Sequence, residues 1–366
     1  MKKPIDIRDK YEDLTKISGK IYKSVNPAVK EMQMRLTPYT PKPFGEKKTY
    51  SQDWPIYAQA CSKEKLMFLR LLKDAVEYLD ISYQYNGNGR PKVDYTDIIK
   101  SLCIKSYHSL SSWRLESELR IARAMGIINI VHKKSTLNKY AQDKIVTKYL
   151  HQIYRIIAEP LASVEAYFAA DATGISNAYG NIHWRKIRHT KEEKKSIKEY
   201  TKLHIISGIK TNVICTAKIT RGHEHESPHF KQLLDDTAKI FTIKEIVADA
   251  GYLSKDNVKA IAKIGAVPFI MGKKNVNVPM KGNSPWGLML RSWKKHQMVF
   301  AEHYHKRSNV ESTFSALKRK FNDFCRCKKI ESQENEILCK IVCFNACVLA
   351  EALLTYDLDS GFMAGL

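Results

Sequence analysis

The pattern of apolar and polar residues changes at about residue 160. Before that point apolar residues recur at helical spacing, which predicts helices at 55–80, around 95–108, at 111–125 and near 136–158. The segment QYNGNGRPKVDY contains Gly87, Gly89 and Pro91 and is predicted to be a loop. Residues 1–50 are basic and weakly periodic, so we expect a partly ordered arm followed by a helical domain at 51–160.

After about residue 165 the pattern becomes one of short apolar runs separated by helical segments. The predicted strands are AYFAADATG, KLHIISGI, NVICTAKIT, IKEIVADAGY and AVPFIM, and the predicted helices are SPHFKQLLDDTAKI and SKDNVKAIAKI. Residues 272–300 are expected to form a loop or a short β insertion, and 303–321 a helix. This order predicts an α/β domain over 161–355, with a mixed sheet and helices on its faces.

The predicted helix at 303–321 holds one Glu among seven Lys, Arg and His side chains. Helical geometry separates an apolar stripe from a second stripe beside it, which consists of Tyr304, Arg307, Glu311 and Lys318. Glu311 therefore stands at the rim of a core. One interpretation is a solvated helix face on which Glu311 pairs with Arg307, and the other is a functional site.

Two of the predicted strands end in an aspartate, at Asp171 in DATG and at Asp249 in DAGY. Each could be a turn residue or a helix cap. The ends of strands are also where α/β sheets place their chemistry, and a buried carboxylate is costly unless it is paired or metal-bound. Together with Glu311, these carboxylates could hold two divalent cations and support phosphodiester chemistry.

Composition indicates a polyanionic partner. The chain has 366 residues, 44% of them hydrophobic, and a net charge of +23, which favours nucleic acid over an anionic membrane. The apolar segment ILCKIVCFNACVLAEALL is interrupted by Lys340, Asn345 and Glu351, so we expect a buried helix and not a membrane span. The N-terminal segment lacks the apolar core of a signal peptide, and a cytoplasmic protein with reduced thiols is expected.

Cysteine and histidine clusters offer alternative metal sites. Cys339, Cys343 and Cys347 recur every four residues and are expected to fill core positions, while Cys325 and Cys327 lie near them without a CxxC pair. The segment GHEHESPHF contains His223, His225 and His229. We favour neutral loop histidines near DNA over a zinc site.

At these residues the chain resembles the DDE transposases of bacterial and archaeal insertion sequences, which have a ribonuclease-H-like core. The signature of that family is Tyr, two residues, Arg, three residues, Glu, six residues, Lys, and it is complete at Tyr304, Arg307, Glu311 and Lys318. Asp171, Asp249 and the group Gly222, Glu226 and Ser227 in GHEHES also match the family. The resemblance covers roughly residues 88–350.

The resemblance implies roles for individual residues. Asp171, Asp249 and Glu311 would be catalytic and bind two Mg²⁺ ions per active site, with Mn²⁺ as the alternative. Tyr304, Arg307 and Lys318 would grip phosphates of the transposon end. Trp286 or Trp293 would hold a flipped base, unless both pack in the core. The implied partners are double-stranded DNA, as transposon ends and target, and a second copy of the chain in a homodimeric DNA complex at the prokaryotic nucleoid.

Several alternatives stay open at the level of sequence. The basic segment NIHWRKIRHTKEEKKSIKEYTKLH, with Arg185 and Lys202, could contact the DNA backbone or be a solvated loop. The tripeptide GRP at 89–91 could enter a minor groove or form a turn. The helical domain could be a helix-turn-helix or a dimerisation bundle. The activity could be cleavage with strand transfer, cleavage alone, or DNA binding by a non-catalytic regulator.

Overall fold

The computed structural model describes residues 53–81, 93–177, 200–273, 275–279, 281–356 and 358. The predicted arm at 1–50, the GRP tripeptide and Arg185 lie outside the described residues. The chain divides into two compact units, Met1–Asp53 and Trp54–Leu366, and all elements described below belong to the second. A further division into separately folding domains at about residue 160 stays a prediction.

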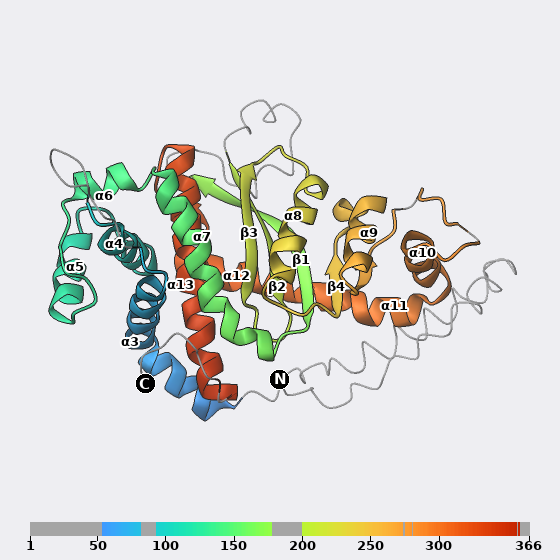
Figure 1. Ribbon diagram of the computed structural model, residues 1–366, viewed down its shortest axis with the longest axis horizontal. Helices are drawn as coiled ribbons and strands as arrows, with labels where there is room; N and C mark the ends of the chain where they lie inside the picture. Colours follow the sequence, from blue (N-terminus) through green and yellow to red (C-terminus); the bar gives the residue numbers. More distant parts are fainter. Residues whose placement is uncertain are drawn as a thin grey trace, which may run out of the picture. The chain divides into compact units, whose positions relative to one another are not determined.

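Helices fill the N-terminal part of this unit (Figure 1). They are α3 (Trp54–Tyr78), α4 (Tyr95–Tyr107), α5 (Leu115–Ala124), α6 (Lys134–Tyr140) and α7 (Lys144–Ala158), followed by the 3₁₀ turn η1 (Glu159–Ser163). The predicted helix at 136–158 is in fact two helices. The chain breaks at Asp143, whose side chain accepts a hydrogen bond from the backbone N–H of Ile145 and so caps a new helix.

The sheet confirms the predicted mixed topology. Its strands are β1 (Tyr167–Asn177), β2 (Thr201–Gly208), β3 (Ile214–Arg221), β4 (Glu245–Ala248) and β5 (Val267–Ile270), in the spatial order β3-β2-β1-β4-β5. The pairs β1–β2 and β2–β3 are antiparallel, whereas β1–β4 and β4–β5 are parallel. A short strand, β6 (Phe324–Cys325), pairs with the end of β1.

Helices α8 (Ser227–Ala238) and α12 (Ser308–Phe321) cover opposite faces of the sheet. Ala172 and His204 are cross-strand partners and share one face, so Thr173 faces the other way. The His204 ring lies 5.1 Å from that of His229 in α8, whereas Thr173 accepts a hydrogen bond from Lys318 in α12. Helix α9 (Lys255–Lys263) connects β4 to β5 and lies beside α8.

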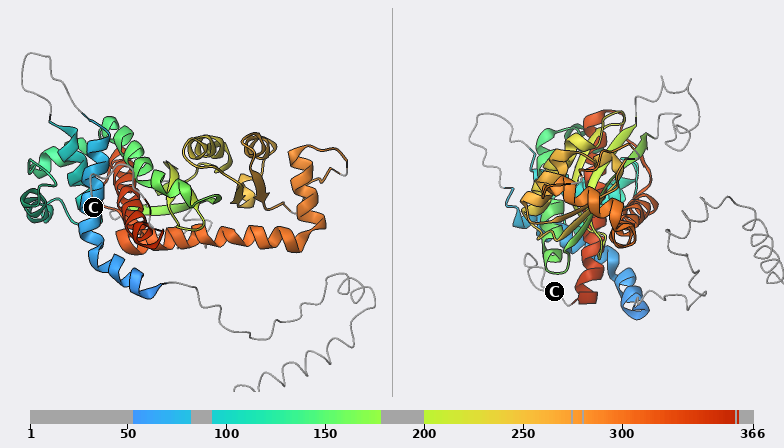
Figure 2. Two further views of the ribbon diagram at one scale, coloured as in Figure 1. Left: turned by 60° about the horizontal axis from the view of Figure 1, so that its bottom comes forward. Right: turned by 90° about the vertical axis from the view of Figure 1, so that its right-hand side faces the viewer.

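The insertion before α12 is only partly a loop. The expectation of a loop or a short β insertion at 272–300 holds for the described residues before Pro285 but is wrong after it, where the chain is helical. Helix α10 (Pro285–Lys295) begins after Ser284, whose hydroxyl accepts a hydrogen bond from the N–H of Gly287. Helix α11 (Gln297–Tyr304) follows it. The single helix predicted at 303–321 is likewise interrupted by a 3₁₀ turn, η6 (His305–Arg307), although α11, η6 and α12 run on in one direction (Figure 2).

The last helix, α13 (Ile330–Tyr356), confirms the predicted buried helix. By length and composition it could cross a membrane, but 78% of its most apolar window is buried inside the protein. Cys339, Cys343 and Cys347 fill core positions as expected, and burial raises the pKa of all three thiols. The Asn345 side chain exchanges two hydrogen bonds with the backbone of Ile214 in β3, which ties α13 to the sheet.

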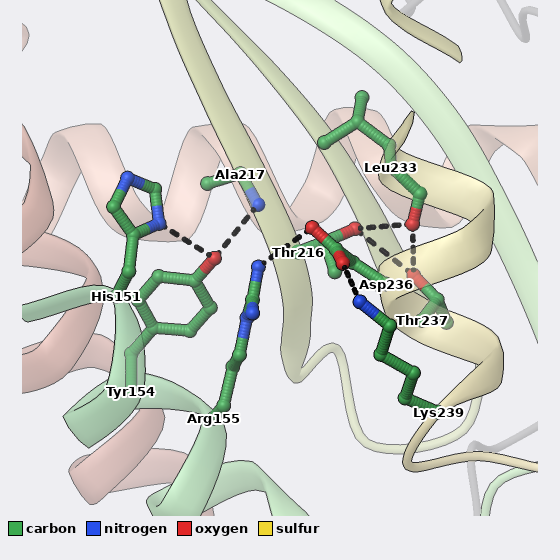
Figure 3. A network of polar contacts seen from close by, with 9 residues as sticks. All are labelled: His151, Tyr154, Arg155, Thr216, Ala217, Leu233, Asp236, Thr237 and Lys239. Carbon is green, nitrogen blue, oxygen red and sulfur yellow. Dashed lines mark hydrogen bonds and ion pairs between the residues drawn. The ribbon is translucent and has the colours of Figure 1, made fainter. Parts of the chain in front are cut away.

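A polar network joins α7 to β3 and α8 (Figure 3). The Tyr154 hydroxyl accepts a hydrogen bond of 3.2 Å from the N–H of Ala217, and Arg155 forms a 2.9 Å ion pair with Asp236. The Nδ1 atom of His151 lies 3.2 Å from the same hydroxyl, and burial lowers the pKa of this histidine to about 4. These contacts fix α7 against β3, the edge strand of the described sheet.

Candidate active site

Asp171 lies within β1 and not at its end, which corrects the expectation from sequence. Strand β1 continues to Asn177 because β2 pairs with it as far as Ile175 and β6 pairs with its last residues. The partner on the other side, β4, ends earlier, with Ala248 opposite Ala170. Asp171 and Asp249 are therefore the next residues on two neighbouring parallel strands, and the register brings them to one place.

Asp249 follows β4 directly and also caps the 3₁₀ turn η5 (Ala250–Tyr252). Its Oδ1 atom accepts a 2.8 Å hydrogen bond from the N–H of Gly251. The interpretation as a helix cap is thus correct for one carboxylate oxygen. This hydrogen bond holds the Asp249 side chain where β4 stops pairing with β1, next to Asp171.

Arg307, in η6, joins Asp171 to Glu311. Its Nη1 atom donates to Oδ2 of Asp171 at 2.9 Å, and its Nη2 atom donates to Oε1 of Glu311 at 2.6 Å. The Glu311–Arg307 pair of the solvated-face interpretation is therefore present. However, the same guanidinium reaches a half-buried carboxylate on the sheet, 136 residues away in sequence, which an ordinary surface pair does not do.

Burial dominates the electrostatics of Asp171. Burial first, and the negative charges of Glu226 and Asp249 after it, raise the pKa of this carboxyl, and the net value is about 6. The N–H of Ala172, at 2.8 Å from Oδ1, and the Arg307 guanidinium act in the opposite direction. An ionised Asp171 thus depends on a nearby cation, a role that Arg307 fills in this structure.

The other signature residues lie on the same face as Arg307 and Glu311, as predicted. Lys318 donates to Oγ1 of Thr173 at 2.7 Å and to the carbonyl of Gly174 at 2.9 Å, so its ammonium group is held on β1 just beyond Asp171. The Arg307 guanidinium lies 5.9 Å from the centre of the Tyr304 ring. Burial raises the pKa of the Tyr304 hydroxyl, which stays protonated.

Glu226 is a further carboxylate at this place, and sequence reasoning gave it no role. It stands just before α8 and forms a 2.8 Å ion pair with Lys202 of β2. A Cβ atom on Gly251 would lie 3.0 Å from Oε2 of Glu226 and 3.9 Å from Oδ1 of Asp249. The acidic-Ser pair in GHEHES was the sequence signal, but its spacing says nothing about this proximity.

The two tryptophans pack against the hydrophobic core, and Lys202 forms its ion pair with Glu226. Both Trp286 and Trp293 are half-buried in α10. The Trp293 indole packs against Gly272 and lines a pocket of about 490 Å³ with Phe300 and other apolar side chains of the insertion. This position agrees with core packing and also leaves an apolar pocket beside the ring.

The donor set of Asp171, Asp249 and Glu311 suits Mg²⁺ by its chemistry, because hard divalent cations prefer carboxylate oxygens. As the side chains stand, no group of three or more His, Cys, Asp or Glu in the described part of the chain is arranged to hold a metal ion. Arg307 accounts for this at Asp171 and Glu311, since it occupies the space between them. His229 instead pairs with Glu224 at 3.1 Å.

The strand order, with helices on both faces and carboxylates beside the β1–β4 junction, defines a ribonuclease-H-like fold. Residues 164–346, half of the chain, match the family described as the transposase DDE domain. The chain therefore belongs to the DDE transposase family.

Other comparisons add little. A solved structure, the Drosophila P element transposase strand transfer complex, matches with a TM-score of 0.26 and 10% identity, covering 84% of this chain and 90% of that one. A similarity at this level has no bearing on the function of the present chain. No curated protein matches the sequence.

Proposed function

We propose that this transposase binds the ends of an insertion sequence, cleaves them by metal-dependent phosphodiester hydrolysis and transfers the 3′-hydroxyl ends into target DNA. One observation carries the proposal. The register of β1 and β4 puts Asp171 beside Asp249, and Arg307 connects Asp171 to Glu311 on α12. Three carboxylates that are far apart in sequence thus lie together where β1 and β4 stop pairing.

Asp171, Asp249 and Glu311 would hold two Mg²⁺ or Mn²⁺ ions. When bound, such ions activate a water molecule or a 3′-hydroxyl and stabilise the leaving oxygen. The residues of the chain itself position the DNA. Arg307 can bind a phosphate through two parallel hydrogen bonds, whereas Lys318, anchored on β1, presents a point charge beside it.

DNA is the proposed partner because the net charge is +23. Tyr304, Arg307 and Lys318 would meet phosphates near the scissile bond, and Trp286 or Trp293 would stack on a displaced base. Arg185 would contact the DNA backbone, and Lys202 could do so only by giving up its ion pair with Glu226. We further propose a homodimer in the DNA complex, and a protein located in the cytoplasm at the nucleoid.

The test is Mg²⁺-dependent nicking and joining of a labelled end duplex. Asp249→Asn keeps the shape of the side chain but removes the charge, and we expect it to lower nicking by at least about a thousandfold. The matched control is Asp235→Asn, an exposed aspartate of α8, which should nick at the wild-type rate. Full nicking by Asp249→Asn would overturn the site assignment.

The same assay separates the alternative activities. Nicking without joined product would identify a nuclease of this fold, and end binding without nicking would identify a non-catalytic regulator. The proposed function requires a product in which the 3′ end of the substrate is joined to a second DNA molecule.

A further inference from the structure

The carboxylates of Glu226 and Asp249 both approach the backbone of Gly251. Oε1 of Glu226 binds Lys202 at 2.8 Å, whereas Oε2 points toward the backbone of Gly251. Oε2 of Glu226 and Oδ1 of Asp249 lie 3.0 and 3.9 Å from a single point, the place where a Cβ atom on residue 251 would stand. Two carboxylate oxygens that approach one stretch of backbone are the kind of ligand that a divalent cation binds.

A second, independent observation comes from Tyr252. Its side chain is completely buried, and its hydroxyl is among the buried polar atoms without a hydrogen-bond partner in the described part of the chain. A buried hydroxyl without a partner destabilises a protein, so this group requires a partner that the described residues do not supply. Tyr252 ends the turn that Asp249 caps, and after burial itself the charges of Glu226, Asp171 and Asp249 raise the pKa of its hydroxyl.

Glu224 shows what an ordinary glutamate in the same segment does. It lies two residues earlier, pairs with His229 at 3.1 Å and accepts a 3.2 Å hydrogen bond from the N–H of Arg221. Its side chain is 38% exposed, compared with 21% for Glu226. Glu224 is therefore a matched control for charge, position in the chain and participation in an ion pair.

We infer that Glu226 is a fourth carboxylate of the metal-binding site, acting with Asp171 and Asp249, and that the Tyr252 hydroxyl supplies a hydrogen bond to the group held there. Lys202 forms an ion pair with Glu226, just as Arg307 forms ion pairs with Asp171 and Glu311. Each basic side chain neutralises carboxylates that a divalent cation would otherwise neutralise. The inference rests on the proposed function, because it adds a residue to the same site.

The experiment measures Mn²⁺ binding to the full chain by calorimetry, without DNA. Glu226→Gln should weaken Mn²⁺ binding about tenfold or more, or remove one of the bound ions, whereas Glu224→Gln should bind as the wild type does. Lys202→Gln should bind Mn²⁺ more tightly, because the competing cation is gone. A purely structural Lys202–Glu226 pair predicts unchanged Mn²⁺ binding in all three variants, and that result would overturn the inference.

Tyr252→Phe separates a role of the hydroxyl in metal binding from a role of the ring in packing. The change removes only the unpartnered hydroxyl, so the protein without metal should melt at the same or a higher temperature. The rise in melting temperature on adding Mn²⁺ should nevertheless be smaller than in the wild type. A lower melting temperature together with a full Mn²⁺-induced rise would contradict the assigned role of the hydroxyl.

Two further variants keep the test decisive. If Glu226→Gln fails to fold because Lys202 loses its partner, the double variant Lys202→Gln/Glu226→Gln removes both charges, and it should still bind Mn²⁺ more weakly than Lys202→Gln alone. Asp249→Asn is the reference. Unchanged Mn²⁺ binding in Asp249→Asn would reject the whole site, whereas loss in Asp249→Asn with wild-type binding in Glu226→Gln would reject only this inference.

Discussion

Arg307 has two carboxylate partners at once, a geometry that a lysine side chain cannot reproduce. Its planar guanidinium donates to Asp171 and to Glu311 through different nitrogens, whereas an ammonium group is a single point of charge. The same two nitrogens suit a phosphate. At the scale of a residue, Arg307 therefore holds the two carboxylates together, and under the proposed function it would turn to the scissile phosphate when a cation takes its place.

Arg307→Lys should lower the affinity for cognate end DNA more than the conserved charge predicts, and Arg307→Ala should lower it by about tenfold or more. The melting temperature of Arg307→Lys should change little, because a cation stays beside Asp171 and the pair with exposed Glu311 contributes only about 0.3–0.5 kcal/mol. Arg307→Ala also removes the partner of half-buried Asp171 and should melt at a lower temperature. End affinity and melting temperature are measured side by side. Intact affinity with a lowered melting temperature would leave Glu311 as an ordinary helix partner.

Lys318→Met should lower the stability of the folded protein. Lys318 donates to two oxygens of β1, and hydrogen bonds from charged groups contribute about 1.5–3 kcal/mol each. We therefore expect the free energy of unfolding in urea to fall by about 1.5 kcal/mol or more, the contribution of at least one such bond. Arg319→Met, an exposed neighbour on the same helix, should change it by less than about 0.5 kcal/mol. Equal effects of the two substitutions would show that the β1 contacts contribute nothing.

At the scale of elements, the junction between α7 and the sheet depends on a neutral histidine. Tyr154 accepts from the N–H of Ala217, which leaves its hydroxyl proton available to Nδ1 of His151. Burial, with the charges of Arg155 and Lys218, lowers the pKa of His151 to about 4. Protonation of the ring would remove its acceptor and add a charge to a junction that already holds Arg155.

This junction predicts a pH dependence of stability. Because the pKa of His151 is lower in the folded protein than the ordinary value of 6.5, the unfolded chain binds more protons between pH 6.5 and about 4. The free energy of unfolding should therefore fall as the pH drops through this window. His151→Gln should flatten the slope, measured by urea unfolding at several pH values. Other buried histidines, such as His204, remain in both proteins, so an identical slope would contradict the assignment.

At the scale of the whole molecule, the net charge of +23 makes the proposed binding of DNA dependent on salt. Binding through phosphates releases counterions, and the logarithm of the association constant then falls linearly with that of the salt concentration. The magnitude of the slope should exceed about 5 between ~50 and ~200 mM salt, and Arg307→Ala should reduce it by about 1. Titration of end DNA at four salt concentrations measures both. A flat dependence would mean that the basic surface is not the DNA-binding surface.

Local pattern was enough for the order of elements and for the composition of the site. The helices at the N-terminal part, the strand and helix series of the sheet and the buried α13 all follow from periodicity, which depends on neighbours a few residues apart. The signature residues Tyr304, Arg307, Glu311 and Lys318 were found in the same way, because helical spacing places them on one face. The predicted loop at 272–300 was wrong only from Pro285 onward, because Ser284 caps a helix that begins there.

Contacts between distant segments were decided only by the tertiary structure. Asp171 lies inside β1 because β2 and β6 pair beyond it, and it lies beside Asp249 because β4 stops pairing at Ala170. The register between strands that decides this cannot be derived from local sequence. The bridge from Arg307 to Asp171, the anchoring of Lys318 on β1 and the approach of Glu226 to Asp249 join residues from different elements. The sequence alone determined which charged groups the protein has, whereas the packing of α8 and α12 on opposite faces of the sheet decided which of them meet, because electrostatic interaction depends on distance in space and burial.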